Sequence, residues 1–133
     1  MERWLGRFAD LFYAALRIVA GAMFACHGAQ KILGAFGGPR MTGNPQMLVA
    51  GLIELVGGIL IAVGLLAGWA AFVASGEMAV AYFKVHAPGG FWPIQNHGEL
   101  AVLYCFVFLF IAARGSGPIS LDALLGHRGR KRR

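Results

Sequence analysis

Charged side chains are scarce in this sequence. They make up 14% of its 133 residues, whereas an ordinary soluble domain has about 25%. Hydrophobic residues make up 58% of the chain, and only six acidic residues stand against twelve lysines and arginines. This balance is not that of an ordinary soluble domain, and it indicates that lipid is the main solvent of the chain.

Cysteines and cofactor motifs are also nearly absent. Cys26 and Cys105 are the only cysteines, and they form neither a CxxC pair nor a metal-ligand spacing. We therefore expect no metal site and no thiol–disulfide catalysis, and interpret both residues as small buried hydrophobes. The sequence has no flavin or dinucleotide (NAD) fingerprint and no set of iron–sulfur cysteines. By itself, such a chain is poorly equipped to complete a redox cycle.

Long hydrophobic runs are what the sequence does contain. Four stretches, at about 11–33, 47–66, 69–85 and 98–113, approach the roughly 20 apolar residues of a membrane-spanning helix. The first stretch is too long, and too polar at its outer end, for a cleavable signal peptide. We predict an all-α integral membrane four-helix bundle, with residues 1–133 forming a single domain.

The positions of lysine and arginine predict how the bundle faces. Arginines precede the first span, and Arg114 and a basic run at 128–133 follow the last one, whereas the opposite loops hold only Lys31, Arg40 and Lys84. Cytoplasmic loops retain basic residues, so both termini are predicted to be cytoplasmic. The ending RGRKRR is expected to fix this topology and to attract anionic lipid headgroups, and we expect no nucleic-acid binding.

Polar side chains gather in the outer half of the predicted bundle. Because the four helices alternate in direction, a rise of about 1.5 Å per residue places Glu54 and Glu77 at a similar depth, roughly 10 to 12 Å below the outer boundary. Glu99 opens the last helix at that boundary. Ionisable residues inside spans usually face the bundle interior. The complete set is His27, Gln30, Lys31, Glu54, Glu77, Lys84 and Glu99.

Two interpretations of this polar set stay open. In the first, Lys31 neutralises Glu54, or Lys84 neutralises Glu77, and the pairs merely hold helices in register. In the second, the groups form a packed polar pocket, which Gly57 and Gly58 favour because small residues let helices approach closely.

Glu99 has a similar choice of roles. The helix dipole favours a carboxylate in the first turn, with Asn96 or His97 helping to cap the helix. Alternatively, Phe91, Trp92 and Pro93 form an apolar rim at interface depth, under which a flat amphipathic molecule could slide to reach polar partners.

Arg17 stands apart from this set, in the inner half of the first helix. No acidic residue lies level with it. We expect it either to snorkel toward the cytoplasmic face or to bond to carbonyl groups at the tight second hairpin.

Four segments carry a family resemblance: ALRIVAGAMFACHGAQKIL, GLIELVGGILIAVGLLAGWAA, FWPIQNHGELAVLYCFVFLFIAARGSGPISLD and residues 77–86. They resemble the DoxX family of small four-helix membrane proteins, which includes DoxD-like subunits and is similar to the methylamine-utilisation protein MauE. The resemblance implies a subunit associated with redox systems in the bacterial cytoplasmic (inner) membrane, since DoxD-type members are similar to the membrane part of a thiosulfate:quinone oxidoreductase.

The leading functional hypothesis is a quinone-interacting membrane subunit of a larger membrane or periplasmic redox complex, a quinone-linked oxidoreductase. Quinone oxygens need hydrogen-bond donors, and quinone reduction takes up protons that carboxylates can supply. Glu54, Glu77 and Glu99 are the candidate proton relay. The candidate ligand-binding residues are His27, Gln30, Lys31, Lys84, Phe91, Trp92, Asn96 and His97.

A structural role, transport and haem binding are the alternatives to this hypothesis. A structural or assembly subunit of a larger redox or photosynthetic complex would use the polar set as an internal strut. Transport fits poorly, because the chain is small and lacks an inverted repeat, although a homo-oligomer could supply a pathway. Haem is not expected, since His97 falls in a loop and no second buried pair accompanies His27 and His97.

Overall fold

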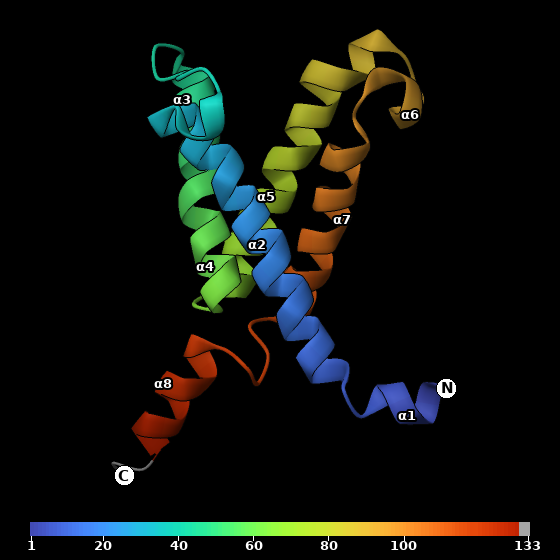
Figure 1. The fold of residues 1–133 in the computed structure, drawn as a ribbon, viewed down its shortest axis with the longest axis vertical. Coiled ribbons are helices and arrows are strands. Elements are labelled where there is room, and N and C mark those ends of the chain that lie inside the picture. The colour runs from blue at the N-terminus through green and yellow to red at the C-terminus, as the bar shows by residue number, and fades with distance from the viewer. Residues whose placement is uncertain (131–133) are drawn as a thin grey trace.

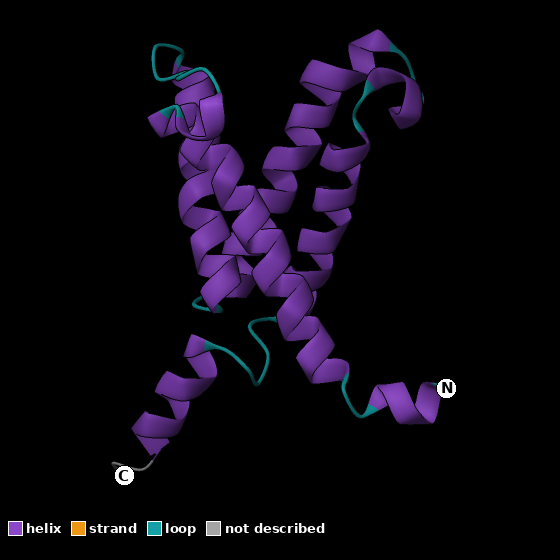
Figure 2. Cartoon of the chain, viewed as in Figure 1, coloured by secondary structure: helices purple, strands orange, loops and turns teal. Residues whose placement is uncertain are grey.

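The computed structural model describes residues 1–130, and the side chains of residues 1–126. Its four long helical segments coincide with the four apolar stretches, and each end lies within three residues of the predicted one. The described chain contains no strand (Figure 2). The four segments are α2 (Ala9–Leu33); α3 (Pro45–Leu52) with the π-helical η2 (Ile53–Gly57) and α4 (Gly58–Val63); α5 (Ala67–Ala81) with the π-helical η3 (Tyr82–His86); and α7 (Glu99–Arg114).

The segments run alternately up and down, so the described ends of the chain lie at the same end of the bundle (Figure 1). We call this the closed end, and it also holds the tight α4–α5 hairpin. The opposite, open end carries the two longer loops, where the two helix pairs spread apart (Figure 1). Short helices extend both ends, namely α1 (Glu2–Gly6) and α8 (Leu121–Arg130) at the closed end, and α6 (Pro93–Asn96) and the 3-10 turns η1 (Ala35–Gly37) and η4 (Ala87–Gly89) at the open end.

Local chemistry sets where the first two segments end and begin. Gly34, in the left-handed conformation at φ 68°, terminates α2. Asn44 caps α3, because its side-chain oxygen accepts a hydrogen bond from the backbone N–H of Gln46 at 2.9 Å, and Pro45 supplies the first helical residue.

Glycines bring the first two segments into close contact. A Cβ atom at Gly21 would lie 2.6 Å from the backbone nitrogen of Ala62, and one at Gly58 would lie 2.6 Å from the carbonyl oxygen of Gly21. Seven residues along each helix, Gly28 and Gly51 repeat this contact, since a Cβ at Gly28 would lie 2.7 Å from the carbonyl oxygen of Gly51. The close approach expected at Gly57 and Gly58 is therefore confirmed at Gly58 and wrong at Gly57, where an added Cβ would meet no atom within 4 Å.

In the second pair, α5 and α7, alanines and a serine hydroxyl allow the helices to come into close contact. Ala67, Ala71 and Ala74 are fully buried, and they let the two backbones run close together. The Ser75 hydroxyl on α5 donates to the carbonyl oxygen of Cys105 on α7 at 2.8 Å. Such small and polar contacts replace the hydrophobic driving force that lipid cannot supply.

Aromatic side chains join the two pairs in the middle of the bundle. The ring of Phe24 on α2 lies 4.7 Å from that of Phe108 on α7, and Tyr104 stacks on Phe108 at 5.2 Å. Ile61 and Ile111 are completely buried on the closed-end side of these rings. The core therefore fills the closed half of the bundle.

Large apolar side chains also cover the outside. Val19, Ile59, Phe72 and Phe106, which come from four different segments, are each at least half exposed. Ala9–Leu33 and Pro45–Val63 are long and apolar enough to cross a membrane, and only 33% and 28% of their most apolar windows are buried inside the protein. Helices that present apolar residues outward are typical of a lipid environment and not of a soluble core.

The two cysteines do not behave alike. Cys105 is half-buried, but Cys26 is exposed on α2, so the expectation that both are buried is wrong for Cys26. The glycine positions explain this, because Gly21, Gly28 and Phe24 occupy the inward face of α2 and turn its neighbour outward. Of the basic tail at 128–133, residues 131–133 and all six side chains lie outside the described part, so its expected lipid contacts stay a prediction.

Arg17 is buried at the closed end and confirms one of the two expected roles. Its guanidinium Nη1 donates to the carbonyl oxygens of Ile61 at 2.6 Å and Ala62 at 2.9 Å, just before the α4–α5 hairpin. Its Nη2 donates to the carbonyl oxygen of Ile119 at 2.7 Å. Arg17 thus binds α4 and the segment after α7 to α2, and it does not snorkel.

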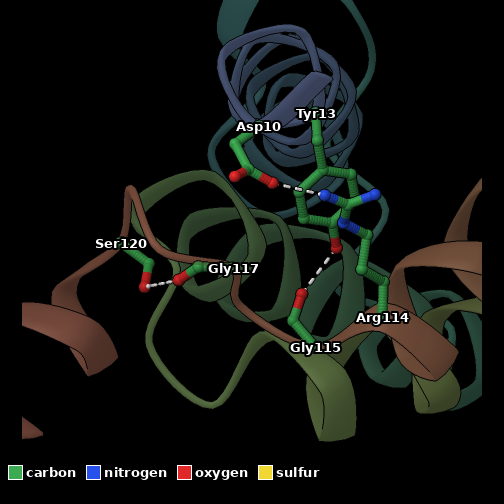
Figure 3. A network of polar contacts seen from close by, with 6 residues as sticks. All are labelled: Asp10, Tyr13, Arg114, Gly115, Gly117 and Ser120. Atoms are coloured by element: carbon green, nitrogen blue, oxygen red, sulfur yellow. Dashed lines mark hydrogen bonds and ion pairs between the residues drawn. The ribbon is translucent and has the colours of Figure 1, made fainter. Parts of the chain in front are cut away.

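The segment after α7 is held to the hairpin and to α2 by further polar contacts. The Asp122 carboxylate accepts from the backbone N–H of Leu66 at 2.8 Å and from the Ser116 hydroxyl at 2.6 Å. Figure 3 shows the contacts nearer α2, where the Tyr13 hydroxyl donates to the carbonyl oxygen of Gly115 at 2.5 Å. There the Arg114 guanidinium also pairs with Asp10 at 2.6 Å.

Candidate functional site

A cavity of about 1000 Å³ occupies the open half of the bundle. It reaches from Phe24 and Tyr104 in the middle of the bundle to Met41, Gln46 and His97 at the open end, and all four helical segments line it. Its volume lies at the upper end of the roughly 300 to 1000 Å³ of small-molecule sites. Most of the lining side chains are apolar, with a few polar groups among them, as is usual for such sites.

The most buried charge of the cavity is Glu54, which lies on the π-helical turn η2 and is 2% exposed. Its Oε1 accepts from Lys31 Nζ on α2 at 2.6 Å. This contact confirms the expected Lys31–Glu54 pair. The other carboxylate oxygen, Oε2, is buried without a hydrogen-bond partner within the described residues.

Two further oxygens of the cavity are in the same condition. Oε2 of Glu77 on α5 and the hydroxyl of Tyr104 on α7 are buried and have no partner in the described part of the protein. The rings of Tyr104 and His27 lie nearly perpendicular to each other, with centroids 6.3 Å apart. Buried polar atoms without partners are uncommon in folded proteins, and among the described residues a fourth one, Nε of Arg17, lies at the closed end.

The polar residues predicted from the sequence fall into two groups. His27, Lys31, Glu54, Glu77, Lys84 and His97 line the cavity. The alternative Lys84–Glu77 pair is not formed, since the ion pairs recorded among residues 1–126 are Lys31–Glu54 and Arg114–Asp10. Lys84 is exposed at the open end.

Gln30, Phe91, Trp92 and Asn96 do not line the cavity. The Gln30 side chain packs directly against Gly38 in the loop after α2. Phe91 and Trp92 are exposed and contact each other edge to face at 5.0 Å. The amide of Asn96 is turned into its own loop, where it donates to the carbonyl oxygen of Gly90 at 2.8 Å and accepts from the N–H of Gly98 at 2.8 Å. These residues shape the open-end loops and do not reach the site.

Glu99 also lies outside the cavity. It is exposed in the first turn of α7, beside a shallow groove formed with Pro93, Val102, Leu103 and Phe106. The expectation that the three carboxylates meet in one pocket therefore needs correction, because only Glu54 and Glu77 share it. The reason is local: the turn at His97, with φ 60°, starts α7 with Glu99 on its outward face. The helix-dipole role remains for Glu99.

Sequence reasoning missed Tyr104 and His86. Tyr104 lies within the apolar stretch of α7, where its hydroxyl needs a hydrogen-bond partner. This need was the signal in the sequence that could have identified it. His86 lines the cavity at the open end, and its Nδ1 lies 3.2 Å from the carbonyl oxygen of Asn96. His86 lies two residues after Lys84, and no motif or spacing in the sequence marks it as a site residue.

The cavity reaches the outer surface of the helices. Val49 on α3, Val80 on α5 and Leu100 on α7 line it, although each is more than 40% exposed. These exposures show that the cavity is open to the outside of the bundle.

The fold and the site together define a class: a small integral membrane protein of four helical segments with a cavity between them. Within this class the chain belongs to the DoxX family, whose family model matches residues 12–87, more than half of the chain. The matched region contains Glu54 and Glu77 but ends before Tyr104.

Two relatives come from Haemophilus influenzae, and both are described as uncharacterised proteins. One is 46% identical over 125 residues, which cover 89% of this chain and 93% of the relative. The other is 29% identical over 72 residues, which cover 54% of this chain and 48% of that protein. No solved structure matches this chain.

Proposed function

We propose that this protein is the quinone-interacting membrane subunit of a redox system. The observation that carries the proposal is the open cavity of about 1000 Å³, whose lining is mostly apolar but includes Glu54, Glu77 and Tyr104. A quinone has matching parts, namely a flat polar ring and a long apolar tail. Its ring would lie among Glu54, Glu77 and Tyr104, and its tail would leave toward the bilayer.

The residues of the cavity suit this ligand chemically. The Tyr104 hydroxyl and the His27 imidazole carry N–H or O–H groups that can donate to the ring oxygens. Glu54 and Glu77 are the two carboxylates that could take up or release protons when the ring changes its redox state. Glu54 also lies in a π-helical turn, and such turns are frequent at functional sites.

We further propose that the protein lies in the bacterial cytoplasmic membrane with both termini in the cytoplasm. The excess of basic residues near the closed end supports this orientation. The open end, with its cavity mouth, would then face outward, where a periplasmic or membrane-bound redox partner can approach. The larger complex would supply the electron donor.

Purification in a mild detergent tests the proposal. We expect quinone in the extracted lipids at a constant ratio to protein, and a higher melting temperature when decylubiquinone or a menaquinone analogue is added. If the protein carries no quinone and gains no stability from either compound, the proposal fails.

A matched pair of glycine variants sharpens this experiment. A Cβ at Gly76, which lines the cavity, has no other atom within 4 Å, so Gly76→Leu should fold and occlude the cavity. Gly57→Leu is the control, because Gly57 has equally free space but does not line the cavity. We expect the stabilisation by quinone to be lost in Gly76→Leu and kept in Gly57→Leu.

A structural or assembly role is the second candidate. The Lys31–Glu54 ion pair, which joins α2 to η2 beside the close contact of Gly28 with Gly51, favours it. Replacing both Lys31 and Glu54 by leucine separates the two roles. Replacing both partners of a buried ion pair by apolar side chains often leaves stability unchanged, so a scaffold protein should still support assembly and activity of the host complex. The quinone proposal instead predicts that the complex assembles but that quinone binding is lost.

A further inference from the structure

We infer that α1 lies in the headgroup layer of the membrane at the closed end, and that Arg7, which follows α1, binds the phosphate of an anionic phospholipid there. This inference goes beyond the proposed function and does not depend on it, because it requires only that the bundle spans a membrane. It is carried by the exposure of α1, by its position at the start of α2 and by the contacts of Arg7.

The helix α1 is not packed into the bundle. None of its residues is buried, and it turns aside from the line of α2 and projects away from the other helices (Figure 1). It nevertheless carries large apolar side chains, since Trp4 is 60% exposed and Leu5 is exposed beside it. Apolar residues gathered on an exposed surface indicate a partner outside the protein.

Charges near the start of α2 mark the depth at which α1 lies. Asp10 and Arg114 form an ion pair whose side chains are exposed, and such charges are not expected within the hydrocarbon of a bilayer. Leu11 and Phe12, immediately after Asp10, are more than half exposed and suit the hydrocarbon. The boundary of the hydrocarbon therefore passes near Asp10. Since α1 ends four residues earlier, it lies at headgroup depth, where tryptophan is enriched.

A row of aromatic rings joins α1 to the lipid-facing surface of α2. The ring centroids of Trp4 and Phe8 are 5.9 Å apart, and those of Phe8 and Phe12 are 6.1 Å apart. Phe12 is exposed, as are other apolar residues of α2 such as Leu16. A bilayer covers this whole surface, from the hydrocarbon at Phe12 to the headgroups at Trp4, whereas a soluble partner would cover only the part outside the membrane.

Arg7 is held against these rings with its donors free. Its guanidinium carbon lies 5.5 Å from the centroid of the Trp4 ring and 4.9 Å from that of Phe8, as in cation–π contacts. Among the described residues, this guanidinium has no hydrogen-bond or ion-pair partner. A guanidinium carries its N–H donors in a planar fork that matches the oxygens of a phosphate. Arg7 is thus positioned for a phosphate before the lipid binds.

The charge balance of the closed end favours an anionic headgroup. Residues 1–17 and 114–133 hold nine of the twelve lysines and arginines but only three of the six acidic residues. Two of these three are occupied, since Asp10 pairs with Arg114 and Asp122 accepts hydrogen bonds from Leu66 and Ser116. One well-placed basic residue near a membrane gives about a fivefold preference for anionic over zwitterionic lipid.

Tryptophan fluorescence of the full-length protein in lipid nanodiscs tests the inference. The variant Trp69→Phe/Trp92→Phe leaves Trp4 as the reporter. The nanodiscs consist of phosphatidylcholine with a small, fixed fraction of lipid that is brominated near the top of its acyl chains and quenches tryptophan on contact. This lipid is either phosphatidylglycerol or phosphatidylcholine. We expect both to quench Trp4, and the brominated phosphatidylglycerol to be enriched around Trp4 by about fivefold.

The other results overturn the inference. If neither lipid quenches Trp4, α1 lies outside the membrane, and if both quench equally, there is no site for an anionic lipid. Inorganic phosphate, compared with chloride at the same ionic strength, should leave the quenching unchanged. If phosphate removes the excess quenching by phosphatidylglycerol, Arg7 binds free phosphate and not the lipid.

Matched variants assign the preference to Arg7. Arg7→Gln should make the two brominated lipids quench Trp4 almost equally. Arg3→Gln removes the same charge from the same region, but the Arg3 guanidinium is not stacked on a ring in the described chain, so most of the preference should remain. Phe8→Leu should lower the preference, because it removes one of the two rings that hold Arg7.

These variants also separate a defined site from diffuse attraction by charge. A preference that survives in Arg7→Gln, or that falls equally in Arg3→Gln, would mean that the net positive charge alone attracts the lipid, and it would contradict the inference. Arg3 and Arg7 are both exposed, so their variants should fold, and melting temperatures in mild detergent close to that of the wild type would verify this.

Discussion

Arg17 at the closed end and Glu54 in the open half are buried to the same degree, at 1% and 2% exposure, but their surroundings differ. The Arg17 guanidinium makes three hydrogen bonds to carbonyl oxygens of two other segments, and only its Nε has no partner in the described chain. Glu54 makes one contact, with Lys31, and leaves one oxygen without a partner in the described chain. A buried charge with several bonds holds elements together, whereas one with a single bond leaves part of its hydrogen-bonding capacity unused.

The packing of the two ends differs in the same way as the bonding of these two buried charges. At the closed end, Asp122 and Ser116 fasten the segment after α7 to the α4–α5 hairpin, and aromatic and aliphatic side chains fill the interior. At the open end, the polar bonds of Asn96, Tyr82 and His86 stay within the loop between α5 and α7 and do not bridge the two helix pairs. One end is therefore built for rigidity and the other leaves room between the pairs.

Arg17→Leu should have the largest effect on stability. The change removes the three hydrogen bonds and leaves the carbonyl oxygens of Ile61, Ala62 and Ile119 buried, which costs roughly 3–5 kcal/mol. Thermal unfolding in mild detergent measures the loss. Arg17→Lys, which keeps the charge but not the planar fork, should fall between the wild type and Arg17→Leu. A melting temperature unchanged in Arg17→Leu would break the comparison.

Gly28→Ala tests the contact that brings Lys31 opposite Glu54. The new Cβ would meet the backbone of Leu55 and Gly51, which cannot rotate away, so α2 must shift at a cost of roughly 1–3 kcal/mol. Gly57→Ala is the control, because its Cβ has free space and alanine favours a helix by up to about 1 kcal/mol. Denaturant titration of both variants should move their midpoints in opposite directions, and a shared direction would count against the glycine contact.

The stability effects of two carboxylate variants, one at the closed end and one in the open half, can be compared directly. Asp122→Asn should lose about 1–2 kcal/mol of stability, because the amide oxygen can still accept the two hydrogen bonds of Asp122 but no longer carries the charge that strengthens them. Glu77→Gln should leave the melting temperature unchanged or higher, since a neutral amide is cheaper to bury than a carboxyl group without a partner. The contrast fails if Glu77→Gln is the more destabilising of the two.

Asp10→Asn should have the smallest effect. The Arg114–Asp10 pair is short, at 2.6 Å, but the two side chains are 37% and 59% exposed. Exposed ion pairs contribute less than about 1 kcal/mol, and salt screens them further. Melting temperatures at low and high ionic strength should nearly coincide for the variant and differ slightly for the wild type. A loss of stability as large as that of Asp122→Asn would mean that the Arg114–Asp10 pair contributes substantially to holding the closed end together.

Much of the fold could be predicted from the sequence, as particular elements show. The four apolar stretches placed the long helices within three residues, because length and hydrophobicity are local properties. The close approach at Gly58 and the pairing of Lys31 with Glu54 also followed from spacing. The short helices α1 and α8 were not anticipated, since their short, polar sequences carry no strong periodic signal.

The candidate site was predicted less completely. Glu54, Glu77, His27 and Lys31 were found because ionisable groups stand out in apolar stretches. Glu99 was placed with them although it faces outward, since depth along a helix axis does not specify the direction in which a side chain points. Tyr104 was missed because an aromatic ring in an apolar helix is counted as hydrophobic until its hydroxyl is seen without a partner.

The sequence by itself determined that the chain is helical, that two of its segments are long and apolar enough to cross a bilayer and that most ionisable residues of the apolar stretches lie in one half of them. These properties depend on composition and on distance along the chain. Only the tertiary structure decided which charges meet and which are satisfied. The rotation of each helix about its axis, the glycine contacts between α2 and α3–α4, and the turn before α7 selected Glu54 and Glu77 for the cavity, excluded Glu99, and bound Arg17 at the opposite end.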